Sequence, residues 1–548
     1  MVDFLPLPLY RLSLSKREER RLFPYILVAC FLLVLYVQPH RPPPHLNPFS
    51  HLSSDSLFDD LPTSLSGETS PSSILTHLLP RLDRLSRQPI LSYEASIAIE
   101  STRCPNTHLQ SNRDQLAGEG EQYWPSVSVE ELREGRERVV KRVRETFERV
   151  EEEELEEMLG KRGRGLVFTA GNKDTMSRLL TSLRILRKRH GCTLPVEIFG
   201  FPNELRGAGT VKDEIDKLGG IEWMEIESKK EEGRWKQFQI KGEAIARASF
   251  SELLYLDSDN VLLSDPAVRF SPPFRLSLTD DTIHKQVLFE SPVYKEYGIV
   301  LWPDFNRDSA ANPVWRLLAT PCDPSYWQAE TGQLLVNKRA RGGMNLVALE
   351  VARAMQADSD FWFHLSGGDK DTFRYAFYFL ALPYSFAPHY PSALGGYLPS
   401  TTQYKGHRFC GHTMLQFALD PSPELDGHAP PLFAHANVLK HSGYNNRRGN
   451  TFRALKKPVD DRLFPSSSSP SLHAPLPNIR QTGLPIRGIC VDIWDASGLA
   501  GEAAEGASVG LYETGEVEVL DWPVEGWARI GEDLEEMYYS EGGVAGAW

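Results

Sequence analysis

A regular alternation of strand-like and helix-like segments, which begins at Gly165, constrains the fold of this chain most. LVFTA, PVEIFGF, IEWMEI and ELLYLDSDNVLL have the apolar pattern of buried strands, with helical patterns after the first and before the fourth. Asp174 is the candidate N-cap of the first helix. The alternation predicts an α/β fold with a mostly parallel sheet, whose ligands bind at the carboxyl ends of the strands.

Two carboxylates follow the fourth strand directly. Asp257 and Asp259 stand between the apolar segments LLYL and VLL. Side chains at i and i+2 can face one hard cation, and Mg²⁺ or Mn²⁺ is commonly shared between carboxylates and substrate phosphates. Such a cation would neutralise a departing diphosphate. The alternative is a turn with solvated acids, and the apolar segments on both sides favour the metal site.

A later segment, LFAHANVLKH, offers further ligands. His435 follows another apolar run, and its neutral imidazole could complete the metal shell. Lys440 could pair with phosphate. A packed structural histidine is the alternative for His435, and both interpretations stay open.

Composition excludes some classes of protein. The formal net charge of −13 argues against a nucleic-acid partner, because phosphate neutralisation needs a basic face. Six cysteines are present without a CxxC pair, so a structural zinc site is not expected. In an oxidising compartment they allow one or two disulfides, whose pairing the sequence leaves open.

An uncharged segment near the N-terminus, Leu22–Val37, predicts a single-pass membrane anchor. Basic residues precede it and the proline-rich QPHRPPPHLNP follows it. A cleaved signal peptide and a buried helix are the alternatives, but no small-residue cleavage site follows. The positive-inside rule leaves the N-terminus cytosolic and the chain after residue 40 lumenal. The short span suits a thin early secretory membrane.

Four stretches carry a family resemblance: SFSELLYLDSDNVLLSDP, FESPVYKEYGIVLWPDFNRDSAANPVW, SYWQAETGQLLVNK and FWFHLSGGDKDTFRYAF. In this order they resemble the fungal Golgi alpha-mannosyltransferases of glycosyltransferase family 71, from about Gly165 to about His441. The resemblance implies a GT-A fold, GDP-mannose as donor and a mannose-containing glycoprotein glycan as acceptor, joined in an alpha-1,2 or alpha-1,3 linkage. It also implies Mn²⁺ as cofactor, retention at the anomeric carbon and type II Golgi topology.

The resemblance assigns the metal and nucleotide residues. Asp257 and Asp259 match the acidic metal-binding motif of the family, and His435 falls in a segment that resembles the metal-completing histidine of related retaining transferases. Asn172 and Lys173 lie where the first strand would meet the nucleotide. A further residue, Lys241, is expected to reach the diphosphate.

The resemblance also assigns residues near the donor sugar. Gly368, Asp369 and Lys370 match a GDK segment that should line the sugar pocket, where the Asp369 carboxylate can grip sugar hydroxyls. Glu330 and Gln333 belong to an ETGQ stretch expected near the donor sugar or acceptor. Glu330 could stabilise positive charge at the anomeric carbon or act as a nucleophile.

Aromatic side chains flank these polar segments. Trp302 and Phe305, and later Tyr326 and Trp327, could form walls that stack on sugar faces, with Asp304 accepting hydroxyl hydrogen bonds. Core aromatics near a loop are the alternative for each of them.

The expected organisation follows from these segments. A charged helix before the catalytic domain has a narrow apolar stripe, for which a solvated helix at the domain edge is favoured over a coiled-coil dimer. The parts are a cytosolic tail (1–21), the anchor (22–37), a stem or linker (38–128), the charged helix (129–160), the GT-A catalytic domain (161–460) and a C-terminal extension with a Ser/Pro-rich linker (461–548).

Three functions remain open. The favoured one is a metal-dependent retaining mannosyltransferase. The second is an enzyme of the same fold that uses a UDP-sugar, and the third is a membrane-anchored glycan-binding protein with an inactive site. A glycosidase is disfavoured, because an acidic motif at a strand end has no role in its mechanism.

Overall fold

The computed structural model describes part of the chain, all of it within the unit Asp55–Trp548. The described residues are 69–101, 123–227, 238–267, 288–322, 327–398, 408–421, 428–439, 448–458, 478–484, 488–494, 517–524 and 534–545. Within these ranges, none of the helices combines the length and the apolar character that a membrane crossing requires. The predicted anchor (22–37), Tyr326 and Lys440 lie outside the described residues.

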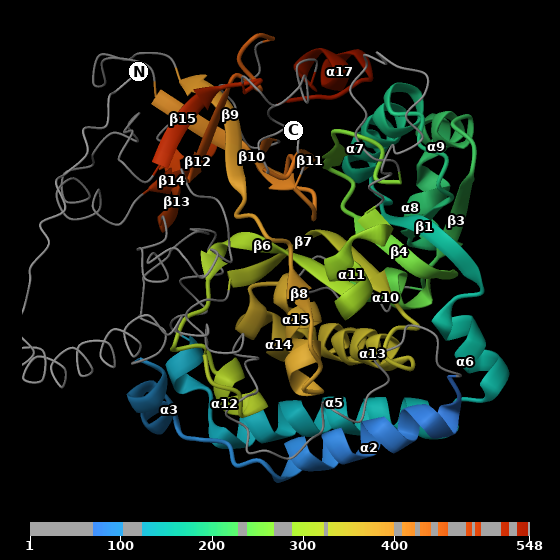
Figure 1. Cartoon of the computed structure of the whole chain (residues 1–548), viewed down its shortest axis with the longest axis vertical. Coiled ribbons are helices and arrows are strands. Elements are labelled where there is room, and N and C mark those ends of the chain that lie inside the picture. Colours follow the sequence, from blue (N-terminus) through green and yellow to red (C-terminus); the bar gives the residue numbers. More distant parts are fainter. Residues whose placement is uncertain are drawn as a thin grey trace, which may run out of the picture. The chain divides into compact units, whose positions relative to one another are not determined.

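The first sheet contains the four predicted strands and three more. In sheet order, its strands in the described part of the chain are β3 (Ile221–Glu225), β2 (Val196–Gly200), β1 (Arg162–Thr169), β4 (Phe250–Leu256), β7 (Trp327–Asn337), β6 (Ile299–Arg307) and β8 (Ser385–Phe386). β1 to β4 are mutually parallel, whereas β7 is antiparallel to both β4 and β6. The predicted α/β class is therefore confirmed, with a mixed sheet (Figure 1).

The strand order reverses at β1, which lies between β2 and β4. At such a switch point the connections leave a crevice beyond the carboxyl ends of the strands. The helix after β1, α7 (Lys173–Arg184), begins there. Its N-cap is Asn172, whose Oδ1 accepts a hydrogen bond from Thr175 N at 3.0 Å. The expectation of Asp174 as the cap is wrong, since Asp174 lies in the first turn and pairs with Arg178.

Short helices complete the region around the first sheet. They are η2 (Ile185–Arg189), α8 (Pro202–Gly207), α9 (Gly209–Asp216), α10 (Ile240–Arg247), η3 (Leu288–Glu290) and α11 (Pro292–Tyr297). The apolar side chains of α7 and α9 join β1, β2 and β4 in one core cluster, which also holds the fully buried Trp302.

A helical layer packs beneath the sheet (Figure 1). Its members are α2 (Pro71–Arg87), α3 (Tyr93–Glu100), η1 (Trp124–Ser126), α5 (Val129–Arg149), α6 (Glu152–Leu159), α12 (Val314–Leu318), α13 (Met344–Ala357), α14 (Ser359–Ser366) and α15 (Lys370–Phe379). The apolar stripe of α5 is buried against α2, α12 and α13, so it is occupied within the chain.

Residues from the segment expected as a stem belong to this layer. Ile74, Leu78 and Leu82 on α2 are completely buried. The guanidinium of Arg81, also buried, donates hydrogen bonds to Leu380 O and Ala381 O at 3.0 and 3.2 Å. Helix α2 therefore contributes to the core of the unit.

A buried lysine joins two helix ends to the sheet. Lys338 Nζ donates to Met158 O near the end of α6 and to Ala246 O and Ala248 O at the end of α10, at 3.2, 2.8 and 2.6 Å. The last carbonyls of a helix lack partners within the helix. Lys338 supplies those partners and so fixes α6 and α10 against β7.

The second sheet is antiparallel and takes strands from the C-terminal part of the chain. In the ranges described it contains β13 (Asn478–Leu484), β14 (Gly488–Trp494), β10 (Arg408–Phe417), β9 (Ser392–Leu398), β12 (Ala454–Pro458) and β15 (Val517–Asp521), with β11 (Pro431–His435) paired to β10 and to β5 (Asn260–Leu262). A last helix, α17 (Leu534–Ser540), follows. β5 links the sheets, because it continues from β4 after only three residues.

The cysteines differ in state. Cys322 and Cys410 are disulfide-bonded, whereas Cys192 is a free, buried thiol. Burial raises the pKa of the Cys192 thiol to about 12, so it stays protonated at neutral pH.

We expect Leu78→Ala to lower the free energy of unfolding by about 2–5 kcal/mol, because it empties a completely buried position between α2 and the layer above it. Chemical denaturation of the purified chain measures this loss. Leu79→Ala, on the less buried side of α2, is the matched control and should cost much less. Equal, small effects of both variants would contradict a core role for α2.

Candidate metal centre

The acidic pair lies in the turn that joins the two sheets. β4 ends at Leu256, and Asp257 N donates to Gly332 O at 2.9 Å. The Asn260 side-chain amide donates to the same carbonyl at 2.8 Å and to Gln333 Oε1 at 2.6 Å. These bonds hold the turn against β7, which directs the two carboxylates to the carboxyl edge of the sheet.

Gln333 lies beneath this turn. It is completely buried, and its side chain holds Asn260. The structure therefore does not bring Gln333 to the open edge where a sugar nucleotide would bind. Its effect on the site passes through Asn260.

His435 meets the two acids through strand pairing. β11 pairs antiparallel with β5, which places His435 opposite Asn260. His435 Nε2 lies 3.2 Å from Asp259 Oδ1 and 3.8 Å from Asp257 Oδ2. Ligand atoms of the three residues all lie within 4.8 Å of one another. Two carboxylates and one imidazole fit a divalent cation of the Mn²⁺ type, and this group could hold a metal.

Glu330 lies behind the histidine. Its Oε1 is 3.1 Å from His435 Nδ1 and accepts a hydrogen bond from Gly332 N at 2.6 Å. A carboxylate on the far nitrogen fixes the orientation of a metal-binding imidazole. The structure thus gives Glu330 a positioning contact with His435.

The pKa values of this pair respond to each other. Burial alone raises the pKa of Glu330, but the charge of His435 and its hydrogen bond outweigh burial and lower the pKa to about 2. Burial lowers the pKa of His435, whereas Glu330 and Asp259 outweigh burial and raise it to about 10. Without a cation the imidazole is therefore protonated at neutral pH, and metal binding must release that proton.

A glycine makes this arrangement possible. Gly332 lies on β7 directly beside the imidazole, and a Cβ at this position would overlap His435 Nδ1 and lie 2.9 Å from Glu330 Oε1. Glycine is therefore needed here for close approach of the backbone to His435.

Lys241 connects the acidic pair to the sugar-pocket segment. Its Nζ lies 3.2 Å from an Asp257 oxygen and 3.0 Å from Asp369 Oδ2, and it donates to Thr331 O at 3.0 Å. Burial lowers the pKa of Lys241, but Asp257 and Asp369 outweigh burial and hold it well above its ordinary value. The ammonium is thus a permanent cation between two carboxylates. Its predicted contact with a diphosphate stays a prediction.

Asp257 itself is held by two side chains. Tyr255 OH donates to Asp257 Oδ1 at 2.7 Å, and Lys241 Nζ lies 3.2 Å from the same oxygen. Burial raises the pKa of Asp257, and the charges of Lys241 and His435 oppose that rise.

The GDK segment begins α15. Gly368 has a φ of +126°, a conformation that favours glycine, and Asp369 takes the N-cap position. Lys370 Nζ donates to Asp304 and, at 2.6 Å, to Gln328 Oε1. Asp369 and Lys370 therefore reach the same sheet edge as the metal group.

The predicted aromatic walls are partly wrong. Trp302 is completely buried, packs edge-on against Phe433 and donates to Phe417 O, so it cannot stack on a sugar. Phe305 is also buried, and Asp304 pairs with Lys370. The side chain of Trp327 is not among those described.

The N-terminus of α7 lies at the end of β1, as expected. Asn172 caps the helix and Lys173 is exposed at its first position. One residue was missed from the sequence: Arg178, whose Nη1 lies 3.2 Å from Asp259 Oδ2. The signal was present, since Asp174 and Arg178 have the i, i+4 spacing of a helical ion pair.

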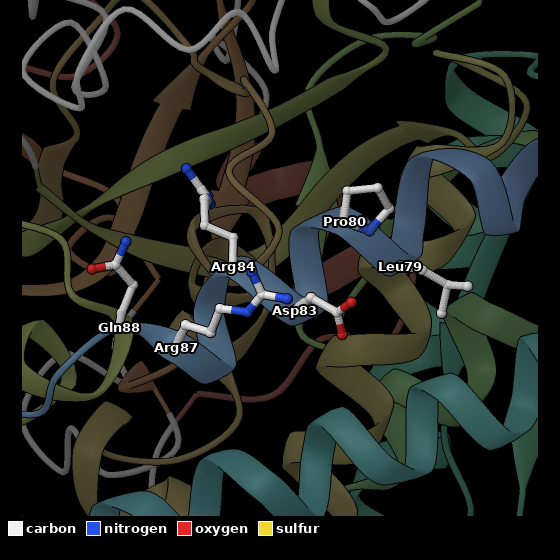
Figure 2. A pocket seen from close by; sticks show the side chains of 6 residues that line it. All are labelled: Leu79, Pro80, Asp83, Arg84, Arg87 and Gln88. Atoms are coloured by element: carbon white, nitrogen blue, oxygen red, sulfur yellow. The ribbon is translucent and has the colours of Figure 1, made fainter.

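A cavity of about 520 Å³ opens elsewhere, beside α2 (Figure 2). It is lined by Leu79, Pro80, Asp83, Arg84, Arg87 and Gln88. All of its described lining comes from one helix and the residue after it, and none of the predicted site residues is among them.

Comparison with known sequences points to sugar transfer. Residues 163–273 and 321–418 match the family described as "Mannosyltransferase putative". These ranges include the acidic pair, Glu330 and the GDK segment, whereas His435 and α17 lie outside them.

Two curated relatives come from Candida albicans. The alpha-1,2-mannosyltransferase MNN24 is 24% identical over 379 residues, which are 58% of this chain and 46% of the relative. The alpha-1,2-mannosyltransferase MNN22 is 33% identical over 105 residues, 19% of this chain and 14% of the relative. The chain therefore matches about half the length of the first relative and less of the second. These matches support a glycosyltransferase.

One solved structure with some similarity is the galactosyltransferase LgtC in complex with donor and acceptor sugar analogs. It is 16% identical to this chain, with a TM-score of 0.25, and the match covers 39% of this chain and 70% of LgtC. Another is the glycosyltransferase GlyE of Streptococcus pneumoniae TIGR4, at 15% identity, a TM-score of 0.25, and coverage of 41% and 45%. TM-scores of this size are too low to establish a shared fold.

We expect Gly332→Ala to weaken Mn²⁺ binding by about 10-fold or more, because the added methyl group displaces His435 from the two acids. Isothermal titration calorimetry with Mn²⁺ measures the effect. Gly163→Ala, where an added Cβ meets nothing within 4 Å, is the matched control. Wild-type affinity in Gly332→Ala would show that His435 is not a ligand.

Proposed function

We propose that this chain is a metal-dependent, retaining alpha-mannosyltransferase of the GT-A fold. It transfers mannose from GDP-mannose to a mannose-containing glycan of glycoproteins. The observation that carries the proposal is the group of Asp257, Asp259 and His435 at the carboxyl edge of a sheet, in a chain that matches a mannosyltransferase family. The names of the relatives favour an alpha-1,2 linkage.

The proposed cofactor is Mn²⁺, with Mg²⁺ as a substitute. Asp257, Asp259 and His435 would hold it. When bound, the cation offsets the charge of the departing diphosphate. Glu330 keeps the imidazole turned toward the acids, and the charge of Lys241 favours the ionised form of Asp257.

The donor sugar is assigned to the Asp369 side of the site. Lys241 holds the Asp369 carboxylate, which is then available to accept hydrogen bonds from sugar hydroxyls. Lys370 and Asp304, which pair with each other, continue the polar edge next to it. The nucleotide is assigned to the start of α7, where the free N–H groups of a helix N-terminus near Asn172 and Lys173 favour anions.

The proposed location is the Golgi membrane, in type II topology with the catalytic unit in the lumen. The basic-then-apolar sequence around residues 22–37 supports the anchor. The disulfide-bonded state of Cys322 and Cys410 supports an oxidising compartment.

The test is nucleotide release by the detergent-solubilised full-length chain from a panel of GDP- and UDP-sugars, with Mn²⁺ or chelator and with a mannose-containing acceptor. We expect GDP release from GDP-mannose that the acceptor stimulates and chelator abolishes. Asp259→Asn should lower the rate by at least about 100-fold, or about 2.7 kcal/mol, because it removes a charged ligand. Asp360→Asn, which changes an exposed acid on α14, is the matched control.

The other outcomes separate the alternatives. Release from a UDP-sugar alone would keep the metal centre and reject mannose as the substrate. A folded chain that binds glycans but releases no nucleotide from any donor would reject the enzyme and favour a binding protein.

A further inference from the structure

The last described helix, α17, shares an apolar core cluster with the segments that carry the metal group, although it is far from them in sequence. One apolar core cluster contains both. From the strands it includes Val261, two residues after Asp259, and Ala434 and Ala436, on either side of His435. From α17 it includes Leu534, Met537 and Tyr538. The apolar face of α17 therefore belongs to the same core as the β5–β11 pair.

Polar contacts fix α17 to the second sheet. Glu535 accepts hydrogen bonds from Gly449 N and, at 3.0 Å, from Phe452 N. The Tyr539 hydroxyl lies 2.6 Å from Thr451 Oγ1. This side of the helix is thus held by the segment that leads into β12.

Other contacts fix the tail of α17 to the helix after β1. The Glu541 carboxylate pairs with Arg189 at 3.0 Å and with Lys188 at 3.4 Å. Its carbonyl accepts a hydrogen bond from Arg184 at 3.1 Å. Glu541 is buried, so these contacts fix the end of α17 against α7 and η2.

Tyr538 is the residue of α17 that lines a cavity together with a candidate metal ligand. A small cavity of about 10 Å³ is lined by Tyr538, Arg178, Asp259 and Val544, among others. Arg178 contacts Asp259 at 3.2 Å, and Tyr538 OH donates to Val544 O at 3.1 Å. Tyr538 and Asp259 thus face one small cavity, together with Arg178.

We propose that α17 and its tail, residues 534–545, are a positioning element of the metal centre, with Tyr538 as its main positioning residue. The segment joins α7 on one side and the β12 side of the second sheet on the other. It packs in one core cluster with β5, which follows Asp259, and with β11, which carries His435. Metal affinity depends on such supporting contacts, whose loss typically weakens binding 10- to 100-fold. This inference rests on the proposed metal-dependent function.

The test is the affinity of the full-length chain for Mn²⁺ by isothermal titration calorimetry. Tyr538→Ala should bind Mn²⁺ about 10-fold more weakly, because the strand pair and Arg178 lose their support. Tyr538→Phe keeps the ring and should stay within about 2-fold of wild type. In the transfer assay, Tyr538→Ala should need more Mn²⁺ for half-maximal rate and regain most of its kcat at saturating Mn²⁺.

Two controls separate positioning from general instability. Glu536→Ala changes an exposed residue of the same helix and should leave Mn²⁺ affinity unchanged. Phe147→Ala empties a buried position on α5, away from the metal group, and provides a destabilised chain with an intact centre. Wild-type Mn²⁺ affinity in Tyr538→Ala, or an equal loss in Phe147→Ala, overturns the inference and leaves the proposed function standing. A wild-type chain that binds no Mn²⁺ overturns both.

Discussion

The antiparallel pairing of β5 with β11 holds the candidate centre together. It brings His435 to Asp259, which precedes it by 176 residues. A shift of one residue in this register would turn His435 to the opposite face of the strand. Two sets of contacts hold this register. The side chain of Asn260 on β5 donates a hydrogen bond to Gly332 O on β7, and Val261 and Ala434 belong to one apolar cluster.

The candidate centre contains more acidic side chains than fixed positive charges. The largely buried acids at the sheet edge are Asp257, Asp259, Glu330 and Asp369. Lys241 and Arg178 supply two fixed positive charges, and protonated His435 supplies a third. Asp174 shares Arg178 with Asp259 and adds a further negative charge to this group. Buried charges are tolerated when they are paired, so the excess of acids favours a bound cation.

The sequence predicts the frame of the site better than its internal contacts. Apolar runs flanked by polar turns identify β1 to β4, and the position of Asp257 and Asp259 after β4 follows from the same pattern. The partner of a buried charged side chain is set by long-range packing, which local periodicity does not contain. The sequence therefore does not contain the contacts of Lys241 with two carboxylates or of Glu330 with His435, and the roles predicted for both residues at the donor stay predictions.

The same limit applies at both ends of the unit. The Pro-, Ser- and Leu-rich sequence before the catalytic domain resembles a linker. Its Ile74, Leu78 and Leu82 nevertheless lie on one buried face of α2. This face packs against α5 and α13, and local sequence periodicity does not contain such long-range contacts. The short, acidic sequence of α17 has no metal-binding motif. Its contact with the strands of the centre depends on the whole second sheet.

The late place of α17 in the chain sets the order in which the protein matures during synthesis. The acidic pair leaves the ribosome first, His435 much later, and α17 about 100 residues after that. At about 5–20 residues per second, this last interval lasts about 5–20 s. Throughout it the nascent chain carries carboxylates and an imidazole whose supporting helix has not yet been made. A chain cut between His435 and α17 would therefore carry all three candidate metal ligands without the helix that packs with them.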